Sequence, residues 1–556
     1  MEIDRRTLMQ IGAAMMVPAC RSETSPSPSG RPSPAPLAPS PVDASVADGP
    51  AHELEEATIA DLQTRLASKK ETSRSLVAKY RARIEALDRA GPQLRAVLEL
   101  DPDVDAIADK LDAERAAGKL RGPLHGIPIL VKDNIDTAGK LTTTAGSLAL
   151  EGTTPPKDAF VVARLRDAGA IILGKTNLSE WANLRGSPAV SGWSGRGGQT
   201  KNPYALDRTP SGSSSGSAVA TAANLCVASL GTETDGSITS PASMCSLAGI
   251  KPTVGLVSRN GVIPIAASQD TVGPIARSVA DCAVLLTVLA ALDPDDPKAT
   301  HPVPGRPTAP EDYTKALDPK ALAGVRLGVP RKGFFGTHRG LDEAMTVALA
   351  KLKELGAVLV DPVDFPPTPD LGTLELEVLM TEMKEQLASY LATRGNTVKV
   401  HSLADVIAFD TAHADREMPL FGQELFEQAQ AKGSTTGVAY LLARTKCVQI
   451  ARTQVLDKLM RDHQLDAFVA ATGGPPWLID PVLGDTTIGP NTTQLPAVAG
   501  YPHVTVPMGW TSSLPVGLSF FGKPWSEGKL LAYAFAFEQA THHRKPPQYL
   551  PSAKPE

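Results

Sequence analysis

The sequence predicts an α/β fold in which a largely parallel or mixed β-sheet is covered by helices. Two observations support this prediction. Short apolar runs suited to buried strands alternate with amphipathic stretches along most of the chain, without an internal repeat. Apolar residues make up 42% and charged residues 21% of the 556 residues, as in an ordinary soluble globular protein. This composition excludes a disordered chain, and no apolar run approaches the ~20 residues that span a bilayer.

The predicted elements follow one another in the order that such a fold requires. Two amphipathic helices come first, with apolar stripes formed by Leu76, Tyr80, Ile84 and Leu87, then by Val104, Ile107 and Leu111. Buried strands are predicted at 127–131, 170–173, 226–230, 325–329, 357–360, 467–470 and 504–506. Helices are predicted between most of these strands, for example at 159–168, 278–292 and 529–540. Residues 371–464 are mostly helical, and we expect them to form a subdomain or cap.

The first fifty residues have the features of an export signal and a tether. Arg5 and Arg6 precede a short apolar stretch, and residues 17–20, which end at Cys20, form a small-residue cleavage site. Residues 1–20 therefore have the features of an export signal. The paired arginines resemble a twin-arginine signal and residues 17–20 a lipobox. We therefore expect export to the periplasm or cell envelope, with Cys20 as the candidate lipid anchor; the alternative is a signal that is simply cleaved. Residues 21–50 hold eight prolines and seven serines, which predicts a disordered stalk before a single domain at 51–556.

Charge, cysteine and histidine usage exclude several classes of partner. A formal net charge of −5 argues against nucleic acid, because neutralising phosphates requires a basic face. The four cysteines after the stalk have no C-x-x-C spacing and apolar or small neighbours, which favours buried free thiols; they are Cys226, Cys245, Cys282 and Cys447. The ten histidines lack paired ligand spacing, so we expect no metal.

Three short motif matches do not indicate function. Residues 169–176 satisfy the P-loop pattern, but 170–173 form an apolar strand rather than a flexible phosphate cradle, so we reject nucleotide binding. Residues 212–216 fit the G-x-S-x-G pattern, which a run of three serines matches easily by chance. Residues 526–529 fit S-x-x-K, but neither S-D-N nor K-T-G follows.

Three other segments indicate catalysis when they are taken together. Lys132 directly follows a buried apolar strand, where desolvation lowers the pKa of an amine and makes it a usable base. Residues 210–217 form a Ser/Gly turn that leads directly into an Ala-rich helix. Ser237 follows a strand and a turn rich in backbone donors. Taken singly, these segments also fit a solvated lysine, a linker or anion nest, and an ordinary loop connection.

These three segments together resemble the amidase signature family. Ser213 and Ser237 are 24 residues apart, and Lys132 lies 81 residues before Ser213, as the family pattern expects. The resemblance implies a central mixed β-sheet covered by helices on both faces, with a helical cap. It also implies that Ser237 is the acyl nucleophile, Ser213 the bridging serine on a cis Gly212–Ser213 bond, and Lys132 the terminal base.

The same resemblance assigns supporting roles. The backbone N–H groups of Thr234, Asp235, Gly236 and Ser237 are the candidate oxyanion hole, and Ser214 is a supporting hydrogen-bond partner. Much of the family has Asp and Gly where this chain has Glu233 and Asp235, whereas the peptide amidase subgroup is similar to this chain. Two residues, Ser211 and Ser240, depart from the expected pattern.

The subgroup resemblance implies hydrolysis of the C-terminal carboxamide of peptides to the free acid and ammonia. The substrate is expected to be a small-molecule or short peptide amide, and no cofactor is expected. We expect a monomer, but the sequence itself does not decide the oligomeric state. The alternatives are an amidase for small aliphatic, aryl or fatty amides, the glutaminase subunit of a tRNA-dependent amidotransferase, and an inactive binding protein at the cell surface. An exported chain cannot meet a tRNA partner, and the intact triad argues against an inactive protein.

Overall fold

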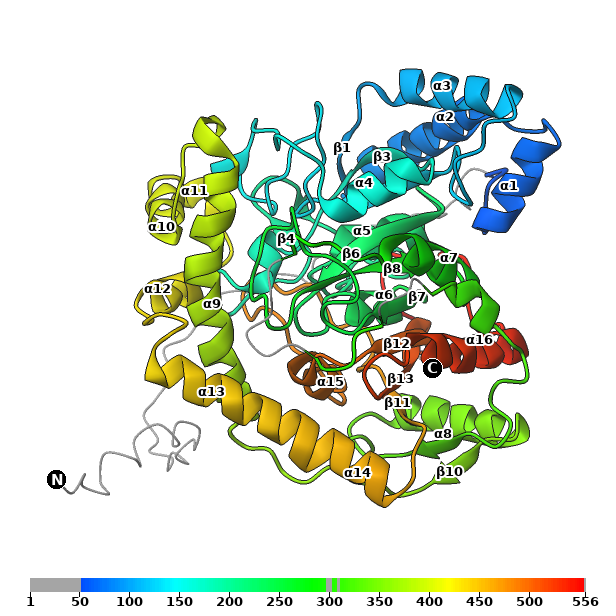
Figure 1. Cartoon of the computed structure of the whole chain (residues 1–556), viewed down its shortest axis with the longest axis vertical. Helices are drawn as coiled ribbons and strands as arrows, with labels where there is room; N and C mark the ends of the chain where they lie inside the picture. The colour runs from blue at the N-terminus through cyan, green and yellow to red at the C-terminus, as the bar shows by residue number, and fades with distance from the viewer. Residues whose placement is uncertain (1–51, 297–302, 308–310, 555–556) are drawn as a thin grey trace, which may run out of the picture. The chain divides into compact units, whose positions relative to one another are not determined.

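The computed structural model describes residues 52–296, 303–307 and 311–554 (Figure 1). The predicted export signal at 1–20, the lipid-anchor candidate Cys20 and the predicted stalk at 21–50 lie outside these residues. Within the described part of the chain, no helix is long and apolar enough to cross a membrane. All the described residues fall within 51–556, the body of the protein that was predicted to be a single domain.

An eleven-stranded mixed sheet runs through this body (Figure 1). In spatial order its strands are β1 (Val97–Leu100), β3 (Ile171–Thr176), β2 (Pro128–Lys132), β6 (Ala228–Glu233), β8 (Thr271–Ala276), β7 (Ala248–Lys251), β12 (His503–Thr511), β13 (Leu514–Gly522), β11 (Ala467–Ala471), β9 (Arg326–Gly328) and β10 (Val358–Val360). β2 pairs in parallel with β3 and β6, and β9 pairs in parallel with β10 and β11, while the other pairs are antiparallel. The predicted mixed sheet is confirmed.

All seven predicted strands are present, as β2, β3, β6, β9, β10, β11 and β12. Every residue of β2, β3 and β6 is buried, as expected for central strands of a sheet that is covered on both faces. A separate two-stranded hairpin is formed by β4 (Trp193–Ser194) and β5 (Gly198–Gln199).

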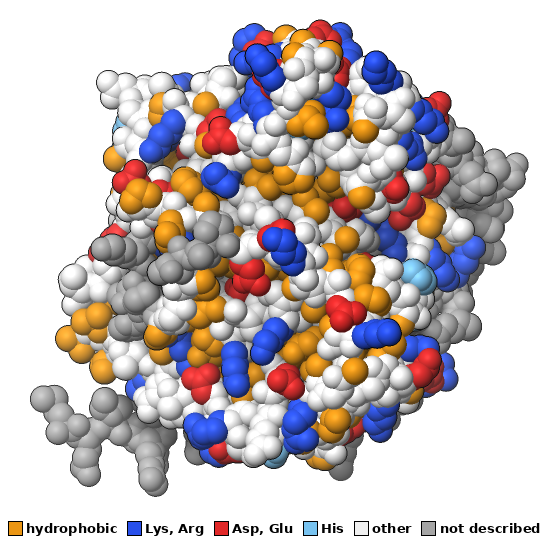
Figure 2. Space-filling model, turned by 45° about the vertical axis from the view of Figure 1, so that its right-hand side comes forward, with side chains coloured by type: hydrophobic (Ala, Val, Ile, Leu, Met, Phe, Trp, Pro, Cys, Tyr) orange, Lys and Arg blue, Asp and Glu red, His pale blue; other side chains and the backbone are white. Residues whose placement is uncertain are grey.

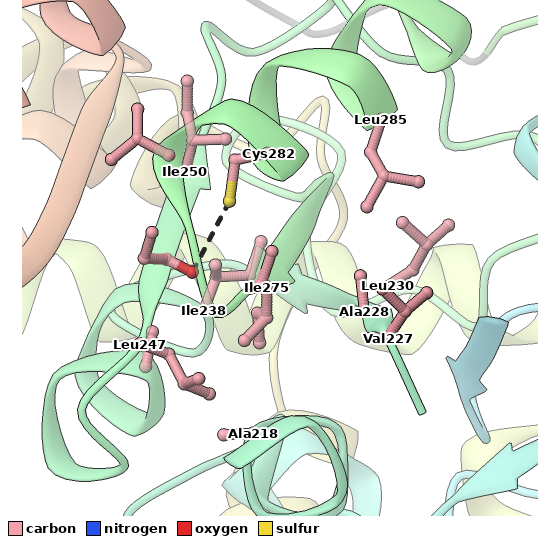
Figure 3. Close-up of a cluster of buried hydrophobic side chains, with 14 of the residues drawn as sticks. Ala218, Val227, Ala228, Leu230, Ile238, Leu247, Ile250, Ile275, Cys282 and Leu285 are labelled. Atoms are coloured by element: carbon pink, nitrogen blue, oxygen red, sulfur yellow. Dashed lines mark hydrogen bonds between the residues drawn. The ribbon is translucent and has the colours of Figure 1, made fainter. Parts of the chain in front are cut away.

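Helices cover the sheet, as predicted (Figure 1). Those outside the helical segment are α1 (Ile59–Ala67), α2 (Ser73–Ile84), α3 (Val104–Ala116), α4 (Phe160–Asp167), α5 (Ser215–Ala222), α6 (Thr239–Met244), α7 (Val279–Leu289), α8 (Arg339–Glu354), α15 (Gln494–Ala499) and α16 (Glu527–Thr541). Figure 3 shows Ala218 of α5 on one side of the central strands, and Cys282 and Leu285 of α7 on the other. The centre of the sheet is therefore packed on both faces.

Residues 371–462 are largely helical. They form α9 (Leu371–Thr393), α10 (Leu403–Ala412), α11 (Ala414–Glu417), α12 (Glu424–Gln430), α13 (Val438–Val448) and α14 (Asp457–Asp462). Apolar residues of α9, among them Met383 and Leu387, pack with Trp181, Ile263 and Ile265 in a second hydrophobic cluster. This packing places α9 beside the loop that precedes β8, close to the candidate site.

The four cysteines in the described body are buried and free, which confirms the prediction. The Cys282 thiol donates a hydrogen bond to the backbone carbonyl of Ala248 at 3.5 Å (Figure 3). Burial raises the pKa of Cys226 to about 11 and disfavours a reactive thiolate. On the face shown in Figure 2, basic and acidic side chains are interspersed, as expected for a chain of small net charge.

Candidate active site

Lys132 is the last residue of β2, between β3 and β6, and its side chain is completely buried. A hydrogen bond of 2.7 Å joins its Nζ to Oγ of Ser213. Two further contacts lead to Thr232, at 2.8 Å to the hydroxyl and 3.3 Å to the carbonyl oxygen. Burial lowers the pKa of Lys132 to about 7, although the charges of Asp270 and Glu233 oppose this shift. The predicted desolvated amine is therefore present, in contact with the predicted bridging serine.

Ser213 belongs to the loop that leads into α5. Its side chain is completely buried, and the Gly212–Ser213 peptide bond is cis, as the resemblance implied. The N–H of Ser179 donates to the carbonyl of Ser213 at 3.0 Å, and the hydroxyl of Ser215 donates to the carbonyl of Ser211 at 2.7 Å. The first bond attaches the loop to the segment that contains Ser179, and the second closes the turn around Ser213.

Ser237 lies in the turn between β6 and α6, and the residue is 8% exposed. The carboxylate of Glu233 accepts hydrogen bonds from the backbone N–H groups of Ile238 at 2.7 Å and Thr239 at 2.9 Å, which fixes this turn. Gly236 has a φ of +79°, a conformation that favours glycine. The glutamate at position 233 is therefore a structural part of the turn that presents Ser237.

Ser214 joins the two serine loops. Its backbone N–H donates to the carbonyl of Ser237 at 3.1 Å. Its hydroxyl donates to the carbonyl of Thr232 at 3.1 Å and accepts from the N–H of Thr232 at 3.2 Å. A Cβ on Gly231 would lie 2.7 Å from this hydroxyl, so only glycine permits the approach. The structure thus brings Lys132, Ser213 and the Ser237 turn together, and Ser214 supports them.

The predicted oxyanion-hole residues lie in the same turn. Among the hydrogen bonds of the described residues, none uses the backbone N–H groups of residues 234–237. These donors are thus available for an anionic oxygen that develops beside Ser237. Burial and the neighbouring Glu375 raise the pKa of Asp235 well above its usual value, which favours the neutral carboxyl. Burial thus disfavours a negative charge on Asp235 beside these donors.

Three polar residues that the sequence did not single out complete the site. Thr232 holds Lys132, and the amide of Asn134 donates to the same threonine hydroxyl at 3.0 Å. Asp270 accepts from the hydroxyl of Thr234 at 2.6 Å and from two backbone N–H groups, and burial raises its pKa to about 6. Lys132 and Thr232 directly follow the predicted strands 127–131 and 226–230, so pairing of these two strands could have identified Thr232. No sequence motif identifies Asp270.

A cavity of about 330 Å³ opens beside the two serine loops. Its lining includes Gly212, Asp235 and Gly236 from these loops, together with residues from 472–477 and 485–493. Ser211 and Ser240, the two departures from the family pattern, also line it, and their hydroxyls are hydrogen-bonded to each other at 2.8 Å. The hydroxyls of Ser211 and Ser240 are therefore hydrogen-bond partners of each other in the cavity wall.

The stretch that matches the P-loop pattern is strand β3, as predicted. Its Lys175 is completely buried and donates to the hydroxyl of Thr143 at 3.0 Å and to the carbonyl of Ile135, so it faces no phosphate cradle. Among the residues that the structure describes, no group of three or more His, Cys, Asp and Glu side chains could hold a metal ion.

Comparisons with known proteins agree with this geometry. A peptide amidase from Stenotrophomonas maltophilia has a solved structure that is 50% identical, with a TM-score of 0.84, covering 89% of this chain and 99% of its own. A probable amidase of Arabidopsis thaliana is 42% identical over 510 residues, which are 89% of this chain and 92% of that protein. A glutamyl-tRNA(Gln) amidotransferase subunit from Roseiflexus sp. is 37% identical over 507 residues, with coverages of 89% and 98%.

The family comparison extends over most of the body. The model of the amidase family matches residues 75–531, which include β2, both serine loops and the segments that line the cavity. The chain is therefore an amidase that belongs to the amidase signature family.

Proposed function

We propose that the enzyme hydrolyses the C-terminal carboxamide of peptides, with Ser237 as nucleophile, Ser213 as proton relay and Lys132 as base. The observation that carries this proposal is the 2.7 Å contact between the buried amine of Lys132 and Ser213, beside the turn that holds Ser237. A serine hydroxyl is a poor nucleophile until a base removes its proton. With a pKa of about 7, Lys132 is substantially uncharged at neutral pH and is such a base.

Thr232 orients the amine for this role. Its carbonyl and hydroxyl oxygens accept the two N–H groups of neutral Lys132, so the nitrogen lone pair faces Ser213. The Ser213 hydroxyl then gives its proton to Lys132 and takes the proton of Ser237. The Ser237 oxygen forms a bond to the carboxamide carbon, and the carbonyl electron pair moves onto oxygen. The free N–H groups of residues 234–237 stabilise that oxyanion, and one such donor is typically worth about 3–4 kcal/mol.

The intermediate collapses by the reverse proton path. The carbonyl re-forms and the carbon–nitrogen bond breaks, while Lys132 returns its proton through Ser213 to the departing NH₂ group as ammonia. Water then attacks the acyl-enzyme, gives its proton to the same relay, and releases the peptide acid and free Ser237. No atom outside the substrate, water and these three side chains is required for the proton transfers.

The cavity supports a carboxamide as the group that is recognised. Among the described residues that line it, none is a lysine or an arginine, and the acidic residues are Asp235 and Asp485. A peptide carboxylate would find no cation there, whereas a carboxamide carries N–H donors for neighbouring oxygens. Glycine, serine, threonine and asparagine make up most of the wall, which suits a polar amide better than a long fatty chain. The 50% identity with a peptide amidase, against 37% with an amidotransferase subunit, supports the same choice.

A direct competition of substrates tests the proposal. The full-length enzyme is incubated with amidated peptides, a small aliphatic amide, an anilide and a fatty amide, and mass spectrometry follows conversion of amide to acid. We expect the largest kcat/KM for the peptide amides, and no ammonia from Ser237→Ala with an unchanged melting temperature. A higher kcat/KM for a fatty or aryl amide would contradict the substrate class, and full activity of Ser237→Ala would contradict the nucleophile.

A further inference from the structure

The loop of residues 475–488, here called the apolar loop, borders the active-site cavity and displays large aliphatic side chains to solvent. Leu478, Val482, Leu483 and Ile488 are 51%, 81%, 65% and 55% exposed. They are four of the eleven exposed large apolar side chains in the described part of the chain. Ile488 lines the cavity, as does Trp477 of the same loop. Such clustering beside a pocket marks an interaction surface, whereas single exposed apolar residues are ordinary.

The two ends of the apolar loop lie against each other. A Cβ on Gly474 would lie 1.6 Å from the carbonyl oxygen of Ile488, so the two ends meet, as in an Ω-loop. Within the loop, the Asp480 carboxylate accepts hydrogen bonds from the N–H groups of Val482 at 2.8 Å and Leu483 at 2.9 Å. The backbone beneath the two most exposed aliphatic side chains is therefore fixed without burial of those side chains.

Polar contacts also attach the apolar loop to the body. The Asp485 carboxylate accepts from the hydroxyl of Ser191 at 2.6 Å and from the indole N–H of Trp477 at 3.0 Å. The N–H of Thr209 donates to the carbonyl of Trp477, and that of Asp485 to the carbonyl of Ala189, both at 2.9 Å. Because polar groups position the loop, its exposed aliphatic side chains remain available to a ligand. A surface held in place before binding loses little conformational freedom when a ligand arrives.

The position of the loop indicates what occupies it. A cavity of about 330 Å³ is at the small end for a ligand site, so it has room for the reacting amide and little more of a peptide. The residues that precede the amide must leave the cavity along its walls, of which the apolar loop is one. The loop contains Asp480 and Asp485 but no lysine or arginine, so its charge does not suit an anionic lipid surface.

We propose that the apolar loop binds the apolar side chains of the residues that precede the C-terminal amide, an inference that rests on the proposed function. Val482 and Leu483 form the centre of this subsite, and Ile488 connects it to the cavity. The enzyme accordingly prefers peptide amides with aliphatic residues before the terminal one over equally long peptides with polar residues there.

The test compares two tripeptide amides, Leu-Leu-Gly-NH₂ and Ser-Ser-Gly-NH₂, on full-length enzyme. The variant Val482→Ser/Leu483→Ser removes aliphatic surface from the loop. The matched control is Val438→Ser/Leu442→Ser, which alters two exposed apolar residues of α13 that do not line the cavity. We expect wild type and control to prefer the leucine peptide. In the loop variant the ratio of the two kcat/KM values should fall by about tenfold, mainly through KM, because two aliphatic contacts are lost.

Each other outcome overturns a specific statement. A ratio that does not change in the loop variant, with both peptides hydrolysed, overturns the subsite and leaves the proposed function intact. Failure of wild type to hydrolyse either peptide overturns the proposed function itself. Loss of a dimer in sedimentation, or of binding to phosphatidylcholine vesicles, with an unchanged ratio would assign the loop to a second copy or to a lipid surface instead.

Discussion

Nζ of Lys132 lies 2.7 Å from Oγ of Ser213, and both side chains are completely buried. Two other lysines, Lys175 and Lys251, are also buried, and desolvation lowers the pKa of each to about 8. Burial of an amine is therefore not what distinguishes the proposed base, Lys132, from the other two lysines. Contact with a serine hydroxyl is the distinguishing feature, because Lys175 bonds to Thr143 and Lys251 to the carbonyl of Pro252.

Replacing Lys132 by methionine should reduce kcat by about 10²–10⁴-fold, the usual contribution of a general base. Lys132→Arg should be equally inactive, because a guanidinium stays charged and cannot accept the proton. Lys175→Met is the matched control: it should lower the melting temperature but keep kcat of the folded enzyme within a few-fold. Steady-state kinetics with thermal unfolding of each variant measures both quantities. Equal loss of kcat in the Lys175 and Lys132 variants would show that burial alone matters.

The pH dependence follows from the pKa of Lys132. Because only the uncharged amine accepts a proton, kcat/KM should rise with pH through about 7 and level off above it. The charge of Asp270 favours the ammonium form, so Asp270→Asn should lower the pKa of Lys132 and move this limb to lower pH. The matched control is Asp281→Asn. Burial also raises the pKa of Asp281 to about 6, but its carboxylate accepts from the backbone N–H of Ile59, so this variant should leave the limb in place. If the acid limb of kcat/KM moved to higher pH in Asp270→Asn, the assignment of this limb to Lys132 would be contradicted.

The sequence predicted the strands whose own residues are mainly apolar. It did not predict strands that are stabilised mainly by pairing with their neighbours. Each of the seven predicted strands is a short, mainly apolar segment. Strand β8, in contrast, has Gly273 and Pro274 at its centre and was not predicted. Strand β8 is stabilised by antiparallel pairing with β6 and β7, which cannot be predicted from its own residues. The residues of the proposed triad lie in segments that match a family pattern. Asp270 lies in no such motif, and only the fold brings it beside the site, where it accepts a hydrogen bond from Thr234.

Thr232 provides a test of how the amine is oriented. Thr232→Val keeps the size of the side chain but removes the hydroxyl that contacts Lys132 at 2.8 Å. Losing one hydrogen bond to the base, worth about 1 kcal/mol, should lower kcat roughly fivefold at saturating substrate. Thr232→Ser retains the hydroxyl and should recover most of this loss. Orientation by Thr232 is excluded if the serine and valine variants have the same kcat.

Glu233 links the stability of the active-site turn to its chemistry. Its buried carboxylate accepts the N–H groups of Ile238 and Thr239, and Glu233→Ala leaves both donors without this partner. An unsatisfied buried donor costs about 1–3 kcal/mol, so loss of the partner of both donors should lower the free energy of unfolding by about 2–6 kcal/mol. Glu233→Gln keeps an acceptor oxygen and should lose less stability. Its lost charge should still lower the pKa of Lys132 and move the acid limb of kcat/KM to lower pH, because the charge of Glu233 raises that pKa. Urea unfolding and pH–rate profiles of the two variants separate these effects, and equal destabilisation by alanine and glutamine would rule out the acceptor role.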